Sequence, residues 1–276
     1  MPLLLATLSS LIFGVGDFAG AMAARRTPAV TVVVGAHLAG FVGLMAAAPF
    51  FGEGVPALTD LGWGALAGAG GSIGIALLYH ALATTRMGVT APIAALVGTA
   101  VPVAFGVVIG ERPATLAWAG MALALPAMLL ISARRSTDAP SLPAVVYGLV
   151  VGVLFGLFGI VISRTSSASG VWPLLSARGA SVILMIAVAR GSHRPVVAER
   201  RAWSLVSATG LLDTTANVLF LLAVRAELLS LVAMIMSLYP ASTVSLARLI
   251  LGERIRRVQG VGMGLAVAAV TLIAVA

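Results

Sequence analysis

The 276-residue chain repeats itself without a gap at a spacing of 142 positions. The matching motifs are Phe13-Gly14 with Phe155-Gly156, Gly110-Glu111-Arg112 with Gly252-Glu253-Arg254, Gly120-Met121 with Gly262-Met263, and Leu123-Ala124 with Leu265-Ala266. We therefore interpret residues 1–134 and 143–276 as two copies of one unit, joined by a linker at 135–142. Each copy carries five long apolar stretches. Because five is odd, the second copy must enter a membrane upside down relative to the first.

Composition places this repeat in a bilayer. Apolar residues make up 60% of the chain and charged residues only 9%. A helix of about 20 apolar residues crosses the roughly 30 Å hydrocarbon core, and unbroken rather than alternating hydrophobicity favours helices over barrel strands. The expected spans lie near 3–22, 30–51, 61–82, 89–109, 114–132, 144–163, 172–189, 203–224, 229–251 and 258–275. The sequence thus predicts an all-α polytopic membrane protein with ten transmembrane helices in two inverted five-helix repeats.

The net charge of +8 comes from arginine alone, and the arginines gather at one end of the expected bundle. Loops after the odd-numbered spans hold Arg25, Arg26, Arg86, Arg134, Arg135, Arg190, Arg194, Arg200, Arg201, Arg254, Arg256 and Arg257. Loops after the even-numbered spans hold Arg112, Arg164 and Arg225. By the positive-inside rule the arginine-rich loops are cytoplasmic, which predicts that both termini lie outside. Charge thus signals topology and not nucleic-acid binding.

The connections between spans are short, so we expect no soluble domain. The chain has no cysteine, and it shows no nucleotide-binding loop, catalytic dyad or metal-ligand spacing. An enzyme, an ATP-driven pump, a metal site and a cofactor therefore have no support, and the expected partners are a small-molecule substrate and the lipid bilayer. The oligomeric state stays open, and a monomer is compatible with the sequence.

Both halves end their fourth span with Gly-Glu-Arg, at 110–112 and 252–254. With the ten expected spans, this motif resembles the EamA-type branch of the drug/metabolite transporter superfamily, over essentially the whole chain. In the second half, Pro240 followed by Leu251-Gly252-Glu253-Arg254 fits the family pattern. In the first half Gly98 takes the place of that proline. The resemblance implies an inner-membrane carrier of amino acids or other small metabolites, with a cavity lined by spans 3, 4, 8 and 9.

We therefore predict a secondary transporter or facilitator that exports small amphipathic metabolites, foremost amino acids, by alternating access. Two alternatives stay open at this point. One is efflux of cationic drugs, and the other is a membrane partner or sensory subunit that transports nothing.

Ionisable residues inside a span are costly, at about 2.5–3.5 kcal/mol near a helix centre. Asp213 lies in the middle of its expected span, and Asn217 stands four residues further on the same face. We predict that both contact substrate, with Asp213 meeting an ammonium group or carrying a proton. The alternative is a structural Asp–Asn pair.

Tyr79 and His80 near the inner end of the third span are further candidates for substrate contact. Tyrosine offers a rigid ring with one polar tip, and histidine both donates and accepts hydrogen bonds. The alternative is an aromatic belt at the lipid headgroups.

Ser237 and Tyr239 stand beside Pro240, where a proline removes a helix hydrogen bond and leaves polar groups next to a bend. We predict substrate contacts for Ser237 and Tyr239, and hinge or gating roles for Pro240, Pro92 and Pro102. The alternative is that the prolines make static bends.

Arg178 is a candidate contact for a substrate carboxylate or phosphate, because a guanidinium binds either bidentately. The alternative is that it pairs with an acid or extends to the interface. For His37 we favour packing or a bridge between helices, and for Asp17 a contact with Arg25 or Arg26. The two Gly-Glu-Arg triplets are interpreted as helix stops. A direct role of Glu111 or Glu253 in transport is the alternative.

Overall fold

The structure is a computed structural model of the chain. It describes residues 1–25, 27–48, 56–84, 87–132, 141–252 and 256–276, without the side chains of residues 79, 82–84, 87–89 and 91. The described residues form the helices α1 (Pro2–Ala24), α2 (Ala29–Ala47), α3 (Leu58–Thr84), α4 (Met87–Val108), α5 (Thr115–Ser132), α6 (Leu142–Ser163), α7 (Trp172–Gly191), α8 (Trp203–Val224), α9 (Leu229–Met236), α10 (Pro240–Leu251) and α11 (Arg257–Ala274). Short 3₁₀ turns, η2 (Ser167–Ser169) and η3 (Arg200–Ala202), precede α7 and α8.

The prediction of an all-helical polytopic membrane protein is confirmed. Nine segments among the described residues are long and apolar enough to cross a membrane, and Pro92–Val108 in α4 is a shorter apolar helix. One expected span differs from its prediction, because the helix expected over 229–251 is interrupted between α9 and α10. The two inverted repeats stay a prediction.

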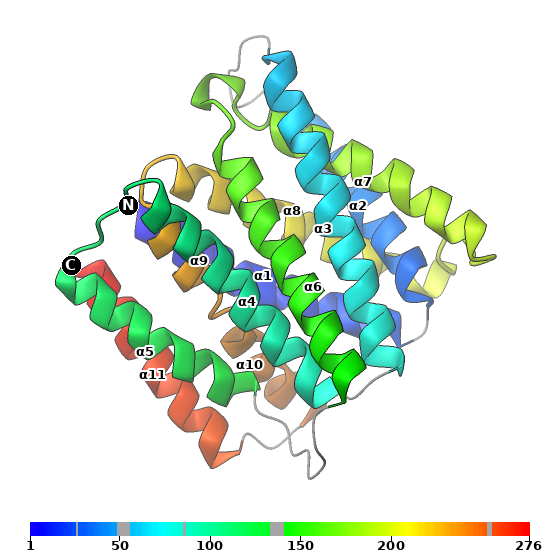
Figure 1. The fold of residues 1–276 in the computed structure, drawn as a ribbon. Coiled ribbons are helices and arrows are strands. Elements are labelled where there is room, and N and C mark those ends of the chain that lie inside the picture. Colours follow the sequence, from blue (N-terminus) through cyan, green and yellow to red (C-terminus); the bar gives the residue numbers. More distant parts are fainter. Residues whose placement is uncertain (26, 49–55, 85–86, 133–140, 253–255) are drawn as a thin grey trace.

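Helices from the two predicted halves pack against each other throughout the bundle (Figure 1). In this view α4 and α6 run side by side in front, α5 and α11 form a pair at one edge, and both termini lie at that edge. Further pairs are α1 with α8, α3 with α7 and with α6, and α2 with α8 and with α7. The fold is thus held by contacts between helices far apart in the sequence.

Small residues bring these helices close together. Gly64 and Gly68 stand four apart on α3, and a Cβ on either would collide with the backbone of α7 at Pro173 or Ala177. No hydrophobic effect drives helices together within lipid, so close backbone contact supplies the dispersion energy instead.

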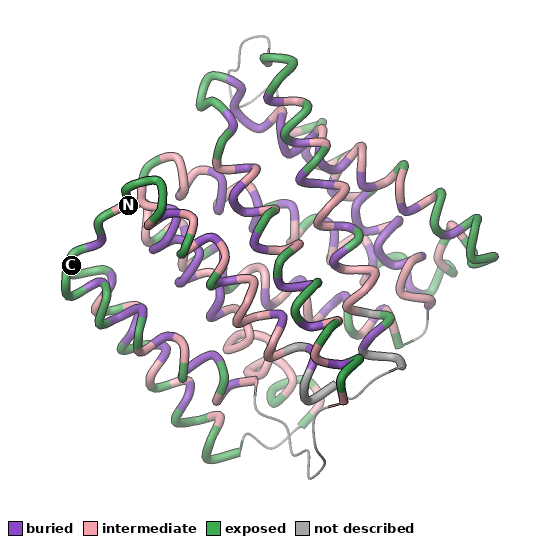
Figure 2. Tube along the Cα trace, viewed as in Figure 1, coloured by how far each residue is buried: buried purple, intermediate pink, exposed green. Residues whose placement is uncertain are grey.

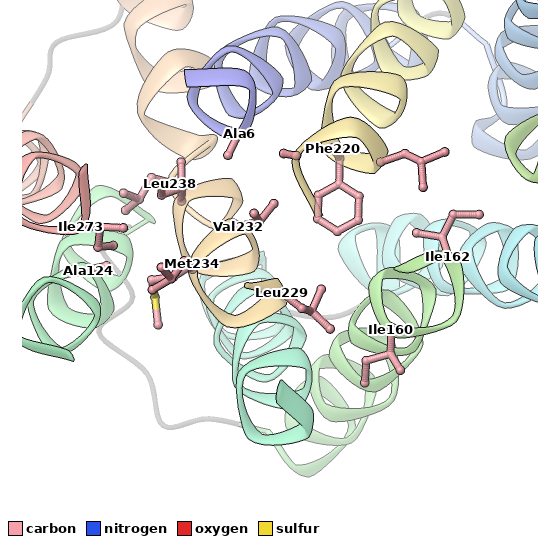
Figure 3. Packing of buried hydrophobic residues seen from close by; sticks show 14 of the residues in the cluster. Ala6, Ala124, Ile160, Ile162, Phe220, Leu229, Val232, Met234, Leu238 and Ile273 are labelled. Carbon is pink, nitrogen blue, oxygen red and sulfur yellow. The ribbon is translucent and has the colours of Figure 1, made fainter. Parts of the chain in front are cut away.

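The main buried cluster surrounds α9. Figure 3 shows Val232 and Met234 of α9 among side chains from neighbouring helices, including Ala6, Phe220 and Ile273. Residues 229–235 of α9 are all buried, whereas none of the residues of α10 is. In Figure 2 the turns of α10 are accordingly drawn as intermediate or exposed. Helix α9 is therefore enclosed by its neighbours, whereas α10 is partly exposed along its length.

Candidate functional site

An ion pair lies inside the bundle between α7 and α8. Arg178 stands two turns into α7, and Asp213 lies in the middle of α8. An Arg178 Nη2 donates to Asp213 Oδ2, and the two side chains are only 9% and 19% exposed. Two opposite charges in direct contact reduce the cost of holding either of them among apolar helices. The structure thus joins two candidates that the sequence treated separately.

Asn217 does not bind the Asp213 carboxylate. Its Nδ2 donates to the backbone oxygen of Asp213 at 2.7 Å, one turn back on the same helix. The side-chain Asp–Asn pair considered as an alternative is therefore absent, because Asp213 turns to Arg178 and Asn217 turns to the helix backbone.

A second polar contact bridges α2 and α7 one turn from Arg178. His37 Nδ1 and Ser181 Oγ are hydrogen-bonded, and the two residues are 5% and 1% exposed. His37 is thus a bridging histidine, as the sequence favoured. Its partner Ser181 was missed, because a serine in an apolar span gives no signal of its own.

Asp17 lies on α1 beside this cluster. A Cβ placed on the preceding Gly16 would lie 3.4 Å from the backbone nitrogen of Asp213, so α1 and α8 meet closely here. Asp17 is half-buried, and among the described residues it makes no hydrogen bond or ion pair. The expected contact with Arg25 is absent, and Arg26 lies outside the described residues.

Ser237 and Tyr239 lie in the turn between α9 and α10. The Ser237 hydroxyl donates to Met234 O at 2.6 Å, and the Tyr239 ring meets Phe13 of α1 edge to face, with centroids 5.3 Å apart. Pro240 is the first residue of α10. Backbone nitrogens of this turn bond to carbonyls three residues back, as at Tyr239 N to Met236 O (3.1 Å), so the break leaves the chain hydrogen-bonded.

The candidate residues of the first half lie on α3 and α4, away from the Arg178–Asp213 pair. Pro92 and Pro102 both lie inside α4, which runs through them as one helix. His80 is exposed, and its ring meets Tyr147 near the start of α6 with centroids 5.7 Å apart. The Tyr79 side chain lies outside the described residues. His80 therefore sits toward the arginine-rich end, whereas Asp213 lies at mid-helix.

The first Gly-Glu-Arg triplet is a cap for two helices. Gly110 has a φ of 101°, which ends α4, and Arg112 donates back to Val107 O at 3.2 Å. The Glu111 carboxylate accepts from Leu229 N at 2.8 Å and Ser230 N at 2.9 Å, the first two amides of α9. A carboxylate at a helix N-terminus satisfies amides that lack a partner and meets the positive end of the dipole. The helix stop was predicted, but the reach of Glu111 to α9 was not.

In the second triplet, Gly252 ends α10 in the left-handed conformation with φ 69°. Glu253 and Arg254 lie outside the described residues.

The sequence of the second half carries a family signature. Residues 142–275 match the family model described as the EamA-like transporter family. This half of the chain belongs to the EamA-like transporters. Together with the apolar helices, the match confirms the resemblance to the drug/metabolite transporter superfamily. A family of transporters also fits the expectation that the chain is not an enzyme.

The fold is found among solved structures as well. One, described only as "Crystal structure of protein", superposes with a TM-score of 0.78 at 16% identity, over 99% of this chain and 96% of that one. At this identity the likeness concerns the fold alone. No curated protein matches the sequence. The comparisons thus support a multi-pass membrane transporter of small molecules. Its substrate class is inferred from the residues of the candidate site.

Proposed function

We propose that the protein is a secondary transporter or facilitator that exports small amphipathic metabolites, with amino acids as the favoured substrates, across the inner membrane by alternating access. The observation that carries this proposal is the Arg178–Asp213 pair inside the bundle. A guanidinium binds a carboxylate bidentately, and a carboxylate binds an ammonium group. An amino acid carries both of these groups, so it can exchange with the two partners of the pair.

The pattern of helix contacts supports two inverted halves. Exchanging each helix with its counterpart 142 residues away turns the α1–α8 contact into the α6–α3 contact, and both exist. The same exchange turns α4–α6 into the contacts of α9 and α10 with α1, while α2–α7 and α5–α11 map onto themselves. Inverted repeats of this kind rock around a central site in alternating-access carriers.

The packing gradient along the ninth span supports access from one end. The buried helix α9 starts at the arginine-poor end, and the partly exposed α10 ends at the arginine-rich end. Substrate would then enter from the arginine-rich end, which the positive-inside rule assigns to the cytoplasm. Entry from the cytoplasm is what an exporter requires.

The other candidate residues would contact the substrate or allow helices to bend. Asp213 and Asn217 on α8, with Ser237 and Tyr239 at the break, would contact substrate in the bundle. Arg178 would meet the substrate carboxylate. Tyr79 and His80 on α3 would contact it nearer the arginine-rich end, and Pro92, Pro102 and Pro240 would allow the fourth and ninth spans to bend.

Counterflow in liposomes tests the proposal. Purified protein is reconstituted into vesicles loaded with one unlabelled amino acid, and uptake of the same labelled compound is followed for a panel of amino acids. We expect saturable uptake for apolar members of the panel and at least a tenfold loss with Arg178→Ala, because a charge-assisted contact contributes about 1.5–3 kcal/mol. Empty liposomes and Arg200→Ala, an exposed arginine, are the controls.

Two results would overturn the proposal. Movement of a cationic dye without any amino acid would indicate drug efflux, and movement of no solute would indicate a non-transporting subunit. Topology is checked separately by Val197→Cys, a 66% exposed position in a chain without native cysteine. Labelling of Val197→Cys by an impermeant reagent outside intact cells would place the arginine-rich end outside and reverse the direction of transport.

A further inference from the structure

The bundle holds two neighbouring carboxylates and one guanidinium. Asp213 is paired with Arg178, whereas Asp17 has no hydrogen bond or ion pair among the described residues. A carboxylate inside a membrane-spanning bundle is costly unless a positive group meets it. Asp17 is therefore a carboxyl group to which a cationic group or a proton can bind.

The two carboxylates lie near each other because α1 and α8 meet closely at Gly16 and Asp213. Two carboxylates placed side by side repel each other when both are charged. Any cation that binds Asp17 therefore gains from Asp213 as well, although Asp213 already has its own partner.

Asp17 lies on the face of α1 that borders the break in the ninth span. Phe13, four residues earlier on that face, contacts Tyr239. Gly14 lies so close to the start of α10 that a Cβ would collide with Tyr239 O and Ser242 Oγ. Since α10 has no buried residue, this face of α1 adjoins a partly exposed part of the bundle.

The helices packed against α1 bring few other ionisable groups. Helix α8 brings Asp213, α2 brings His37, which is bonded to Ser181, and the described part of α10 brings only the exposed Arg248 near its far end. Tyr239 lies in the turn, and α9 has no ionisable residue. None of these supplies a cation bound to Asp17.

We infer that Asp17 binds the ammonium group of the transported amino compound, while Asp213 serves as a positioning residue that holds Arg178 for the carboxylate. This inference rests on the proposed transport function and assigns its substrate class as molecules with a primary ammonium group. It also moves the ammonium contact to Asp17 on α1 from Asp213, where both the sequence and the exchange described under the proposed function placed it.

The test measures how three related compounds compete with labelled leucine counterflow. The compounds are leucine, 3-methylbutylamine, which lacks the carboxylate, and 4-methylpentanoate, which lacks the ammonium group. In Asp17→Asn we expect the amine to lose potency by about tenfold or more, as removal of a charge-assisted contact predicts, while 4-methylpentanoate keeps its potency. In Asp213→Asn we expect the potency of 4-methylpentanoate to fall, because Arg178 loses its anchor.

The outcomes separate the two proposals. If the parent moves leucine and Asp17→Asn keeps the amine's potency, the Asp17 assignment is wrong and transport stands. If Asp17→Asn abolishes the pH dependence of leucine counterflow but keeps the preference for amines, Asp17 carries a proton and the assignment is again wrong. If the parent moves no amino acid, the proposed function itself fails.

Asp17→Glu keeps the inference testable should Asp17→Asn fail to fold. It retains the charge and displaces it by one methylene group. We expect it to change the potency of the amine more than that of the acid. Equal changes for both compounds would count against an ammonium contact.

Discussion

The two halves of the chain share their framework and differ in their charges. Glycines that end helices or permit close crossings recur 142 residues apart, as Gly14 and Gly156 or Gly110 and Gly252 do. The charged residues of the bundle do not recur. The pairs are Arg178 with Ala36, Asp213 with Gly71, and Asp17 with Gly159.

The counterpart positions lie next to other helices or side chains. A Cβ on Gly71 would lie 3.2 Å from the Phe158 ring, and one on Gly159 would lie 3.5 Å from the Phe220 ring. The carbonyl of Ala36 contacts α8 at Gly210, where a Cβ would collide with it. The polar cluster thus lies on one side of the predicted repeat, and close packing restricts the side chain at Gly71, the counterpart of Asp213.

Breaking the ion pair gives the largest expected effect on stability. Asp213→Ala leaves the Arg178 guanidinium buried without a partner, which costs about 3–5 kcal/mol. The double variant Arg178→Ala with Asp213→Gly installs the residues of the other half and removes both charges. We expect it to recover much of the loss in thermal unfolding in detergent, while transport stays absent. Equal losses in the single and double variants would show that the pair contributes through packing and not through charge.

The framework itself is tested at Gly14. Gly14→Ala places a methyl group against Tyr239 O and Ser242 Oγ, so we expect a loss of about 1–3 kcal/mol from overpacking. Gly62→Ala is the matched control, because nothing lies within 4 Å of its Cβ position. Both are compared by their thermal midpoints in the same detergent. A midpoint for Gly14→Ala at or above that of Gly62→Ala would mean that α1 shifts away from α10 without cost.

Glu111 tests the connection between the halves. Glu111→Ala removes the acceptor for the first two amides of α9, and loss of a helix cap costs about 0.5–2 kcal/mol. Glu199→Ala, an exposed glutamate, is the control. We expect hydrogen exchange at Leu229 and Ser230 to rise in Glu111→Ala alone. Unchanged exchange there would remove the capping role.

Pro240→Ala is expected to give the smallest change in stability. It should also separate an effect on transport most clearly from an effect on stability. As the first residue of α10 it leaves no amide unsatisfied, so Pro240→Ala should cost only about 0.4–1 kcal/mol through the unfolded state. If the break is a hinge, the maximal rate of counterflow should fall while the folded fraction stays high. A parental rate would make the break a static bend.

Much of the fold could be predicted from the sequence. The apolar spans and the short connections follow from apolar length, which is a local property, whereas the two inverted repeats stay a prediction. A kink at Pro240 was predicted inside 229–251, whereas the structure separates this span into α9 and α10, with α1 in close contact at Gly14. Asp213 was singled out because an acid in a span is rare. Its partner Arg178, 35 residues earlier on another helix, could not be assigned from spacing.

The sequence by itself determined that this chain is a helical membrane protein with its arginines at one end, because lipid forces backbone bonds to close within each helix and membranes sort charge by side. Only the tertiary structure decided which polar groups meet. Asp213 pairs with Arg178, His37 bonds to Ser181, and Glu111 caps α9. Asp17 has no partner among the described residues. The reason is physical: inside a bundle a charge or hydroxyl is satisfied by whichever helix packs beside it, and helix neighbours are chosen by the close fit of small residues along their whole length.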